Sequence, residues 1–180
     1  AWFKPDKLPA ASKAIGIVCK TAVLVVDGAN EVNYCIAMDN GLTGSNQAIF
    51  GMFEGSTGTD AVTRYETTLT TGQWYHLEFT FNNSTDASAL YLNGRQVATG
   101  SSTQTPATNT MGVSVGEVNA TNDQLGYTEY FLGKIDEVRI FNYARTPAQI
   151  AYDYNRGAPV AWYKFDESTW TNNCAPAEGY

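Results

Sequence analysis

The sequence predicts an all-β fold in which two antiparallel sheets pack face to face, and three observations carry this prediction. Charged residues make up only 16% of the 180 residues, whereas glycine (16 residues), tyrosine (11) and phenylalanine (8) are abundant, which favours strands and turns over helices. Short strand-like segments recur along the chain with turn residues between them. The chain is also 43% hydrophobic and long enough to bury a substantial core as one domain.

The predicted strands begin with four short apolar runs, which span residues 15–20, 22–26, 33–38 and 48–53. The most regular alternation lies at 73–81, where every second residue from Tyr75 to Phe81 is apolar. Next, residues 90–92 and 95–98 flank the pair Asn93-Gly94. Because this pair accepts the two positive φ angles of a type I′ turn, the segment predicts a β-hairpin.

The remaining elements are a loop, two strand-like segments and one helix. Residues 99–110 are rich in Thr, Ser, Gly, Pro and Asn and predict a solvated loop, whereas 111–118 and 129–141 predict strands. One short helix is expected near residues 147–156, because Thr146 can cap its N-terminus, Pro147 suits its first turn and Gly157 can end it.

The three cysteines, Cys19, Cys35 and Cys174, have none of the paired spacings of a zinc site or a redox motif. They allow at most one internal disulfide. Cys19 and Cys35 lie in successive predicted strands and could face one another, so two alternatives stand: a Cys19–Cys35 bridge, or two buried free thiols.

Net charge and hydropathy exclude several kinds of partner. The formal net charge is −7, the sequence pI is about 4.6, and the few Lys and Arg residues are scattered, so we expect neither nucleic acid nor an anionic membrane as a partner. No apolar run is long enough to span a bilayer as a helix. The chain starts without Met or a signal-like segment, so we expect a mature protein or, preferably, a piece of a longer one.

Four segments together resemble the laminin-G-like jelly-roll modules of the concanavalin A-like lectin/glucanase superfamily. They are residues 2–6, 72–80, 90–98 and 133–142, the last followed by the predicted helix. The resemblance covers residues 1–157. It implies a jelly-roll sandwich of about a dozen strands, an extracellular or cell-surface location, binding of glycans or proteins, and often a calcium ion.

The chain departs from this family at its C-terminus. Residues 160–167 (Val-Ala-Trp-Tyr-Lys-Phe-Asp-Glu) resemble the strand with which such modules usually open. We therefore interpret 1–157 as a domain that lacks its usual opening strand and 158–180 as an opening-strand-like tail. The tail could start a further, truncated module, fold back to fill the vacant sheet edge, or fill the edge of a neighbouring subunit; the last alternative gives head-to-tail self-association.

The predicted metal ligands are Asp136 and Asp166. Asp136 shares strand parity with Val138 and Ile140, which places a carboxylate among apolar side chains, where it needs hydrogen-bond donors or a cation. The resemblance implies a structural calcium ion at Asp136, with Asp166 in the opening-strand sequence as a further ligand. The alternative is a carboxylate satisfied by backbone N–H groups or by Arg139.

Ligand binding is predicted in the loop 119–127, which combines Asn122 and Asp123, as hydrogen-bonding groups, with the aromatic ring of Tyr127. The alternative is that these are ordinary turn and edge residues.

Catalysis is not expected. The single histidine, His76, has no nucleophile motif nearby, and the sequence contains no Glu-x-Asp-x-x-Glu triplet. The nearest carboxylates, Glu54, Asp60 and Glu66, lie in a Gly/Thr-rich segment that shows no strand alternation.

The sequence thus predicts a non-catalytic extracellular module that binds a glycan or a surface protein and serves adhesion or substrate targeting. One alternative is a structural subunit of a surface filament, assembled by strand exchange through residues 158–180. A second alternative is an accessory module of a secreted glycoside hydrolase.

Overall fold

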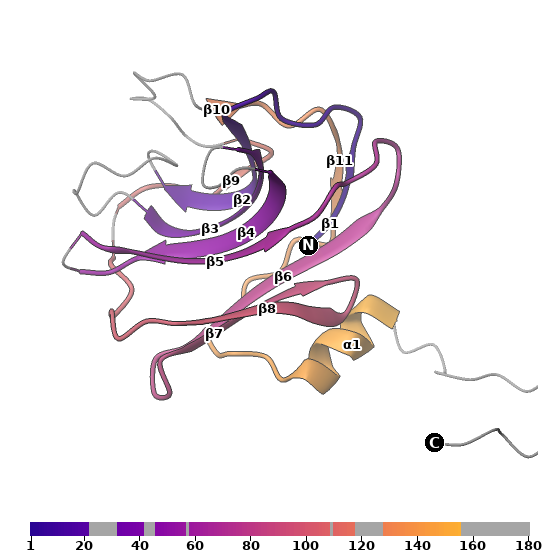
Figure 1. Cartoon of the computed structure of the whole chain (residues 1–180). Helices are drawn as coiled ribbons and strands as arrows, with labels where there is room; N and C mark the ends of the chain where they lie inside the picture. The colour runs from indigo at the N-terminus through magenta and orange to yellow at the C-terminus, as the bar shows by residue number, and fades with distance from the viewer. Residues whose placement is uncertain (22–31, 42–45, 57, 109, 118–127, 156–180) are drawn as a thin grey trace, which may run out of the picture.

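The computed structural model describes residues 1–21, 32–41, 46–56, 58–108, 110–117 and 128–155 (Figure 1). These residues form two packed sheets and one short helix, which confirms the predicted all-β jelly-roll sandwich. The predicted strand at 22–26, the tail 158–180 and Cys174 lie outside the described residues.

The first sheet contains five strands in the order β11-β1-β6-β7-β8, and all its pairs are antiparallel. Its strands are β11 (Gly133–Asp136), β1 (Trp2–Pro5), β6 (Tyr75–Asn82), β7 (Ala87–Leu92) and β8 (Arg95–Ser101).

The second sheet has the order β10-β2-β3-β4-β5, and a short strand, β9, also pairs with β2. Its strands are β10 (Thr128–Glu129), β2 (Lys13–Thr21), β3 (Val32–Asn40), β4 (Gln47–Glu54), β5 (Asp60–Glu66) and β9 (Ser114–Val115). Only the pair β10–β2 is parallel among the described strands.

The main core fills the space between the sheets, where apolar side chains from alternate positions of the facing strands meet. Its fully buried members include Phe3, Ile17, Ile49, Leu77 and Leu90. Burying side chains of this size stabilises the fold by roughly 1.5–3 kcal/mol each. Strand β2 is buried along almost its whole length, since a second, smaller cluster of buried residues covers its other face.

The Asn93-Gly94 hairpin is confirmed. Asn93 and Gly94 have φ angles of 51° and 75° between β7 and β8, as a type I′ turn requires. The Asn93 side chain adds a tie to the neighbouring strand, because its Oδ1 accepts a hydrogen bond from the backbone N–H of His76 at 2.9 Å. The turn sets the register of β7 with β8, and the hydrogen bond to His76 links both strands to β6.

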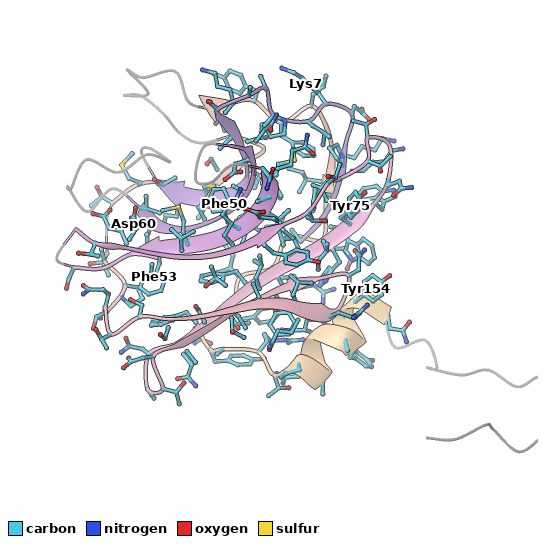
Figure 2. All side chains as sticks on the ribbon, viewed as in Figure 1. Lys7, Phe50, Phe53, Asp60, Tyr75 and Tyr154 are labelled. Carbon is cyan, nitrogen blue, oxygen red and sulfur yellow. A yellow bond between two sulfur atoms is a disulfide. The ribbon has the colours of Figure 1, made fainter. Side chains whose placement is uncertain are left out.

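The predicted helix is also confirmed, as α1 (Pro147–Asn155). The hydroxyl of Thr146 accepts from the N–H of Gln149 at 3.3 Å, and the Gln149 side chain accepts from the N–H of Thr146 at 3.0 Å, which forms a capping box. Ile150 is fully buried, and Tyr154 stacks on Trp2 at 5.4 Å between ring centroids (Figure 2). The predicted C-terminal Gly157 lies outside the described residues.

Two predicted boundaries are wrong in the C-terminal part of the chain. The strand expected over 129–141 is broken, and its second piece, β11, ends at Asp136. Asp136 is the last residue of β11 that pairs with β1, opposite Trp2, and the chain leaves the ladder at the next residue, Glu137, which has a φ of 47°. Likewise, only 114–115 of the segment 111–118 forms a strand.

A third correction concerns Glu54, Asp60 and Glu66. The segment that contains them was expected to lack strand structure, yet Asp60–Glu66 is strand β5 and pairs along its full length with β4. The Gly/Thr-rich composition belongs to the connection between the two strands, whereas Val62, Thr63 and Tyr65 are typical strand residues.

Of the two alternatives for Cys19 and Cys35, a disulfide or two free thiols, the structure shows the disulfide. Cys19 of β2 and Cys35 of β3 are directly opposite in the antiparallel register and are joined by a disulfide, with 4.1 Å between their Cα atoms. Both side chains are buried, in the smaller cluster on the outer face of the second sheet.

Candidate ligand-binding site

The loop that carries the predicted ligand-binding residues starts and ends at one edge of the second sheet. Strand β9, before the loop, and strand β10, after it, both pair with β2. The N–H of Gly116 donates to the carbonyl of Ile17 at 3.0 Å, and the N–H of Phe131 donates to the carbonyl of Gly116 at 2.8 Å. The two ends of the loop are therefore held together on β2.

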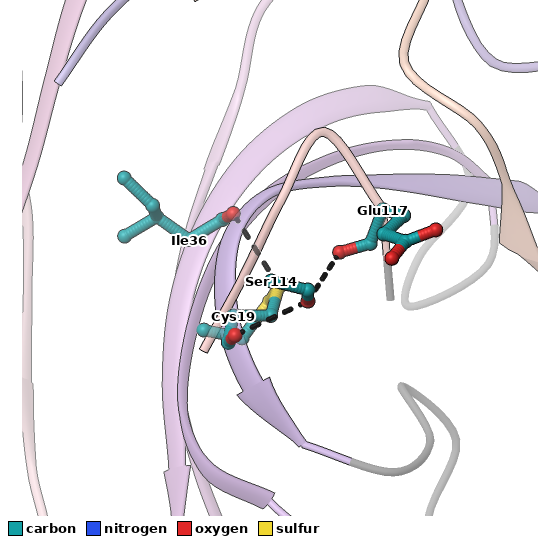
Figure 3. Close-up of a disulfide and its surroundings, with 5 residues drawn as sticks. Cys19, Ile36, Ser114 and Glu117 are labelled. Atoms are coloured by element: carbon teal, nitrogen blue, oxygen red, sulfur yellow. Dashed lines mark hydrogen bonds between the residues drawn. A yellow bond between two sulfur atoms is a disulfide. The ribbon is translucent and has the colours of Figure 1, made fainter. Parts of the chain in front are cut away.

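Ser114 connects this loop base to the disulfide (Figure 3). Its hydroxyl oxygen lies 3.2 Å from the carbonyl oxygen of Cys19 and 2.7 Å from that of Glu117, so the hydroxyl can donate to either. Ser114 is itself buried. The side of the loop that precedes residue 118 is thus anchored on the disulfide-bearing strand.

Asn122, Asp123 and Tyr127 lie outside the described residues, so their prediction as ligand-binding residues is untested. The described residues that follow the loop add an aromatic side chain that the sequence analysis did not single out. Tyr130 is 78% exposed, and Leu132 close by is 59% exposed. The signal that could have found Tyr130 is its place directly after the Asn/Asp-rich loop, because a tyrosine at the end of a short strand has little core to enter.

A cleft of about 380 Å³ opens elsewhere, between β3 and β6, and residues 137–143 border it. Its walls are mainly apolar, with Tyr34, Phe79 and Phe81 among them, and Phe53 lies 4.2 Å from Phe81 between ring centroids (Figure 2). No sequence motif predicted this cleft, because it arises from the distance between two sheets rather than from a local pattern.

Charged groups surround one end of the cleft. Arg145 forms an ion pair with Asp153, and Arg139 lies 3.5 Å from the same carboxylate. Burial raises the pKa of Glu78, a further wall residue, while the nearby positive groups act against this shift.

His76 has a structural environment, as the sequence analysis expected. It is 5% exposed and lies against the rings of Trp2 and Tyr154, at 5.2 and 6.1 Å between centroids. Burial lowers its pKa to about 4, and the amino group of Ala1 adds to the shift. The imidazole is therefore neutral near pH 7, and the described structure places no nucleophilic Ser or Cys side chain in hydrogen bond with it.

Of the three carboxylates nearest to a catalytic set in the sequence, Glu54, Asp60 and Glu66, two lie together. Glu54 and Asp60 are opposite one another in the β4–β5 ladder, whereas Glu66 lies at the other end of β5 in an ion pair with Arg64 at 2.8 Å. Glu54 is only 1% exposed and accepts a hydrogen bond from the backbone N–H of Val32 at 2.9 Å. Such a buried carboxylate cannot contact a polymeric substrate, so the pair does not form a glycosidase site.

Asp60 provides a test of the interpretation that Glu54 and Asp60 are structural residues and not a catalytic pair. Burial, followed by the nearby Glu54, raises its pKa to about 6, and its Oδ1 is buried without a hydrogen-bond partner among the described residues. Because the native pKa exceeds the unfolded one of about 3.9, ionisation destabilises the fold as the pH rises through both values.

We expect Asp60→Asn to stabilise the protein at pH 7 by about 1 kcal/mol, after allowance for solvent screening of a partly exposed side chain. This corresponds to roughly 2–4 °C in melting temperature and should vanish near pH 3.5, where the wild-type carboxyl is protonated. Thermal unfolding followed by circular dichroism at both pH values checks it. Glu66→Gln, which removes an exposed ion-paired carboxylate, should give no such gain; an equal gain at both pH values for Asp60→Asn would contradict the assignment.

The burial expected for Asp136 is wrong. The side chain is exposed, because the strand ends there, and its Oδ1 accepts a hydrogen bond from the N–H of Glu137 at 2.7 Å. Within the described residues no group of three His, Cys, Asp or Glu side chains is arranged to hold a metal ion. Asp166 lies outside the described residues, so the prediction of a calcium ion held by Asp136 and Asp166 is untested.

Comparison with known proteins identifies the family to which this chain belongs. The family model described as the concanavalin A-like lectin/glucanases superfamily matches residues 1–151. A search of curated protein sequences finds no match.

The solved structures that share the fold include the following two. A heptameric SAP-like pentraxin from Limulus polyphemus is similar with a TM-score of 0.58 and 14% identity, over 85% of this chain and 66% of the pentraxin. A putative carbohydrate binding protein from Bacteroides ovatus is similar with a TM-score of 0.52 and 19% identity, over 83% of this chain and 43% of that protein. The chain thus spans just under two thirds of the first protein and less than half of the second.

Proposed function

Because the chain belongs to the concanavalin A-like lectin/glucanases superfamily, we propose that it is a non-catalytic module that binds a glycan outside the cell or at its surface. Binding of this kind would serve adhesion or the targeting of a larger protein to its substrate. A surface protein is the alternative ligand.

The observation that carries this proposal is the exposed ring of Tyr130, which follows in the sequence directly after a segment rich in hydrogen-bonding groups. Tyr130 is 78% exposed at the point where the loop with Asn122, Asp123 and Tyr127 rejoins the sheet. An aromatic face can pack against the apolar C–H face of a sugar ring, while amide and carboxylate oxygens accept hydrogen bonds from sugar hydroxyls. An exposed aromatic ring that follows such residues in the sequence suits a glycan better than an apolar peptide.

The disulfide supports a location outside the cytosol. Disulfides persist in secreted and surface proteins, whereas cytosolic thiols are kept reduced. Cys19 and Cys35 are joined at the centre of the second sheet, so the bond is part of the fold. No helix in the described part of the chain is long and apolar enough to cross a membrane.

Catalysis has no support in the described residues. Glu54 is buried, Glu66 lies at the opposite end of β5, and His76 is packed between aromatic rings. We therefore favour binding over hydrolysis. Incubation with β-glucans should release no reducing sugar.

The test is binding of the purified chain to a panel of immobilised glycans, followed by titration of the best ligand. We expect Tyr130→Ala to weaken binding about tenfold, the loss of roughly 1.4 kcal/mol of contact. Tyr152→Ala is the matched control, because Tyr152 is 66% exposed on α1, which lies at the opposite end of the molecule from β10 (Figure 1). Equal weakening by both variants, or no glycan binding at all, would contradict the proposal.

A further inference from the structure

Two lysines lie side by side on the outer face of the first sheet. Lys4 of β1 and Lys134 of β11 are directly opposite in the antiparallel register, where the Cβ atoms of such a pair are about 5 Å apart. Both side chains point outward, because the next pair along, Phe3 and Ile135, packs in the core. Lys134 is exposed and Lys4 is half-buried. Two positive charges therefore share one small area of the surface.

No carboxylate neutralises this pair in the described part of the chain. Neither ammonium group forms an ion pair with a described Asp or Glu side chain. Asp136 lies on the same face, two residues from Lys134, but its Oδ1 accepts a hydrogen bond from the N–H of Glu137. Like charges directly opposite one another destabilise a sheet, and folds break such local rules mainly at functional sites.

The indole ring of Trp74 lies next to the lysine pair. Phe3 is opposite Tyr75 where β1 pairs with β6. The same register, continued by one residue, places Trp74 beside Lys4, on the side away from Lys134. Trp74 is 43% exposed. Because neighbouring strands are about 4.8 Å apart, the three side chains form a row about 10 Å long, which we call the Lys–Trp row.

We propose that the Lys–Trp row binds an acidic sugar, with its carboxylate between the two ammonium groups and its ring against Trp74. Lysine ammonium groups donate charge-assisted hydrogen bonds to a carboxylate, and an indole ring packs against the apolar C–H face of a sugar. This inference goes beyond the proposed function and does not depend on it. The row belongs to the first sheet, whereas Tyr130 follows β10 of the second.

The charge of the whole chain favours a sugar over other anions. The chain has 18 Asp and Glu residues against 11 Lys and Arg, so a densely charged polyanion is repelled by most of the surface. A sugar with a single carboxylate needs only the local pair of lysines. A small inorganic anion would leave the exposed ring of Trp74 without a contact. An oligosaccharide with carboxylates spaced along it suits both parts of the row.

The test is calorimetric titration of the full chain with acidic oligosaccharides of hyaluronan, alginate and galacturonan. Each is compared with its neutral methyl ester, which keeps the sugar rings and removes the charge. We expect at least one acidic probe to bind about fivefold or more tightly than its ester, and this preference should vanish between 50 and 500 mM NaCl because salt screens surface charges. Acetate at the same carboxylate concentration should not compete. If no acidic probe binds more tightly than its ester, or if acetate competes equally, the proposal is wrong.

Variants of the row assign the binding to its residues. Lys4→Gln and Lys134→Gln should each remove most of the preference for the acid over the ester, and Trp74→Ala should weaken binding of both about tenfold. Lys20→Gln is the matched control, because it removes the same charge from β2 of the second sheet and should leave binding unchanged.

Lys134→Glu separates binding from folding. An opposite charge facing Lys4 should raise the melting temperature by roughly 1–3 °C while binding of the acidic probe is lost. The lost binding would then not be due to a damaged fold. A Lys134→Glu variant that binds the acidic probe like the wild type, or a loss of equal size in Lys20→Gln, would overturn the proposal. Binding of neutral glycans through Tyr130 is unaffected by either outcome.

Discussion

Replacing Cys19 and Cys35 together by alanine should lower the free energy of unfolding by about 3 kcal/mol. The disulfide joins residues 16 positions apart, and closing a loop of this length restricts the unfolded chain by about that amount. The expected cost is large compared with the total stability of a domain, which is roughly 5–15 kcal/mol. Urea denaturation of the two proteins gives the difference from the midpoints and slopes.

The control for this prediction is chemical. Unfolded without reductant, the wild type should react with one equivalent of an alkylating reagent, at Cys174, whereas the unfolded and reduced wild type should react with three. Reduced wild type should then unfold at nearly the same urea concentration as the double alanine variant. Three reactive thiols in the protein unfolded without reductant, or identical midpoints with and without reductant, would show that the bridge does not form in solution.

The disulfide also has a consequence for the candidate binding site. The carbonyl of Cys19 is one of the two acceptors near the Ser114 hydroxyl, and β2 holds both ends of the loop base. Loss of the bridge should therefore weaken ligand binding as well as stability. The reason is that β2, which holds both ends of the loop, would be less rigid.

Local signals were sufficient for some elements of this fold. The Asn93-Gly94 turn and the N-terminal cap of α1 at Thr146 depend on residues within a few positions of one another, and both were predicted correctly. The reciprocal hydrogen bond from Gln149 was not predicted. Strand β6 was predicted for the same reason, since its alternation lies in the strand itself. The pairing of Cys19 with Cys35 depends on the register of two strands. The sequence alone therefore did not decide between a bridge and two buried free thiols.

Features that depend on a distant partner were not predictable. Asp136 is exposed at the end of β11, and the end of this strand is set by its pairing with β1, more than 130 residues earlier in the chain. The proximity of Glu54 to Asp60 likewise follows from the β4–β5 register. The cleft arises from the distance between two sheets and has no local signature in the sequence.

Replacing Gly51 by valine should have an effect of similar size to the loss of the disulfide, about 3 kcal/mol or more. Gly51 lies on β4, with its Cα directed at β6 of the other sheet. A Cβ added there would lie 2.2 Å from Cγ and 2.5 Å from Cβ of Phe79, closer than atoms can approach. Because the Phe79 Cβ is fixed to its backbone, rotation of the ring cannot relieve the overlap, and the two sheets must move apart.

The expected result is a fall in melting temperature of roughly 6–12 °C, or failure to fold. Gly112→Val is the matched control, because nothing lies within 4 Å of a Cβ built at that exposed position, and its melting temperature should change little. Gly51→Ala provides a graded intermediate, since the methyl group alone already overlaps the ring. Equal melting temperatures for the Gly51 and Gly112 variants would contradict the close contact of the two sheets at Phe79.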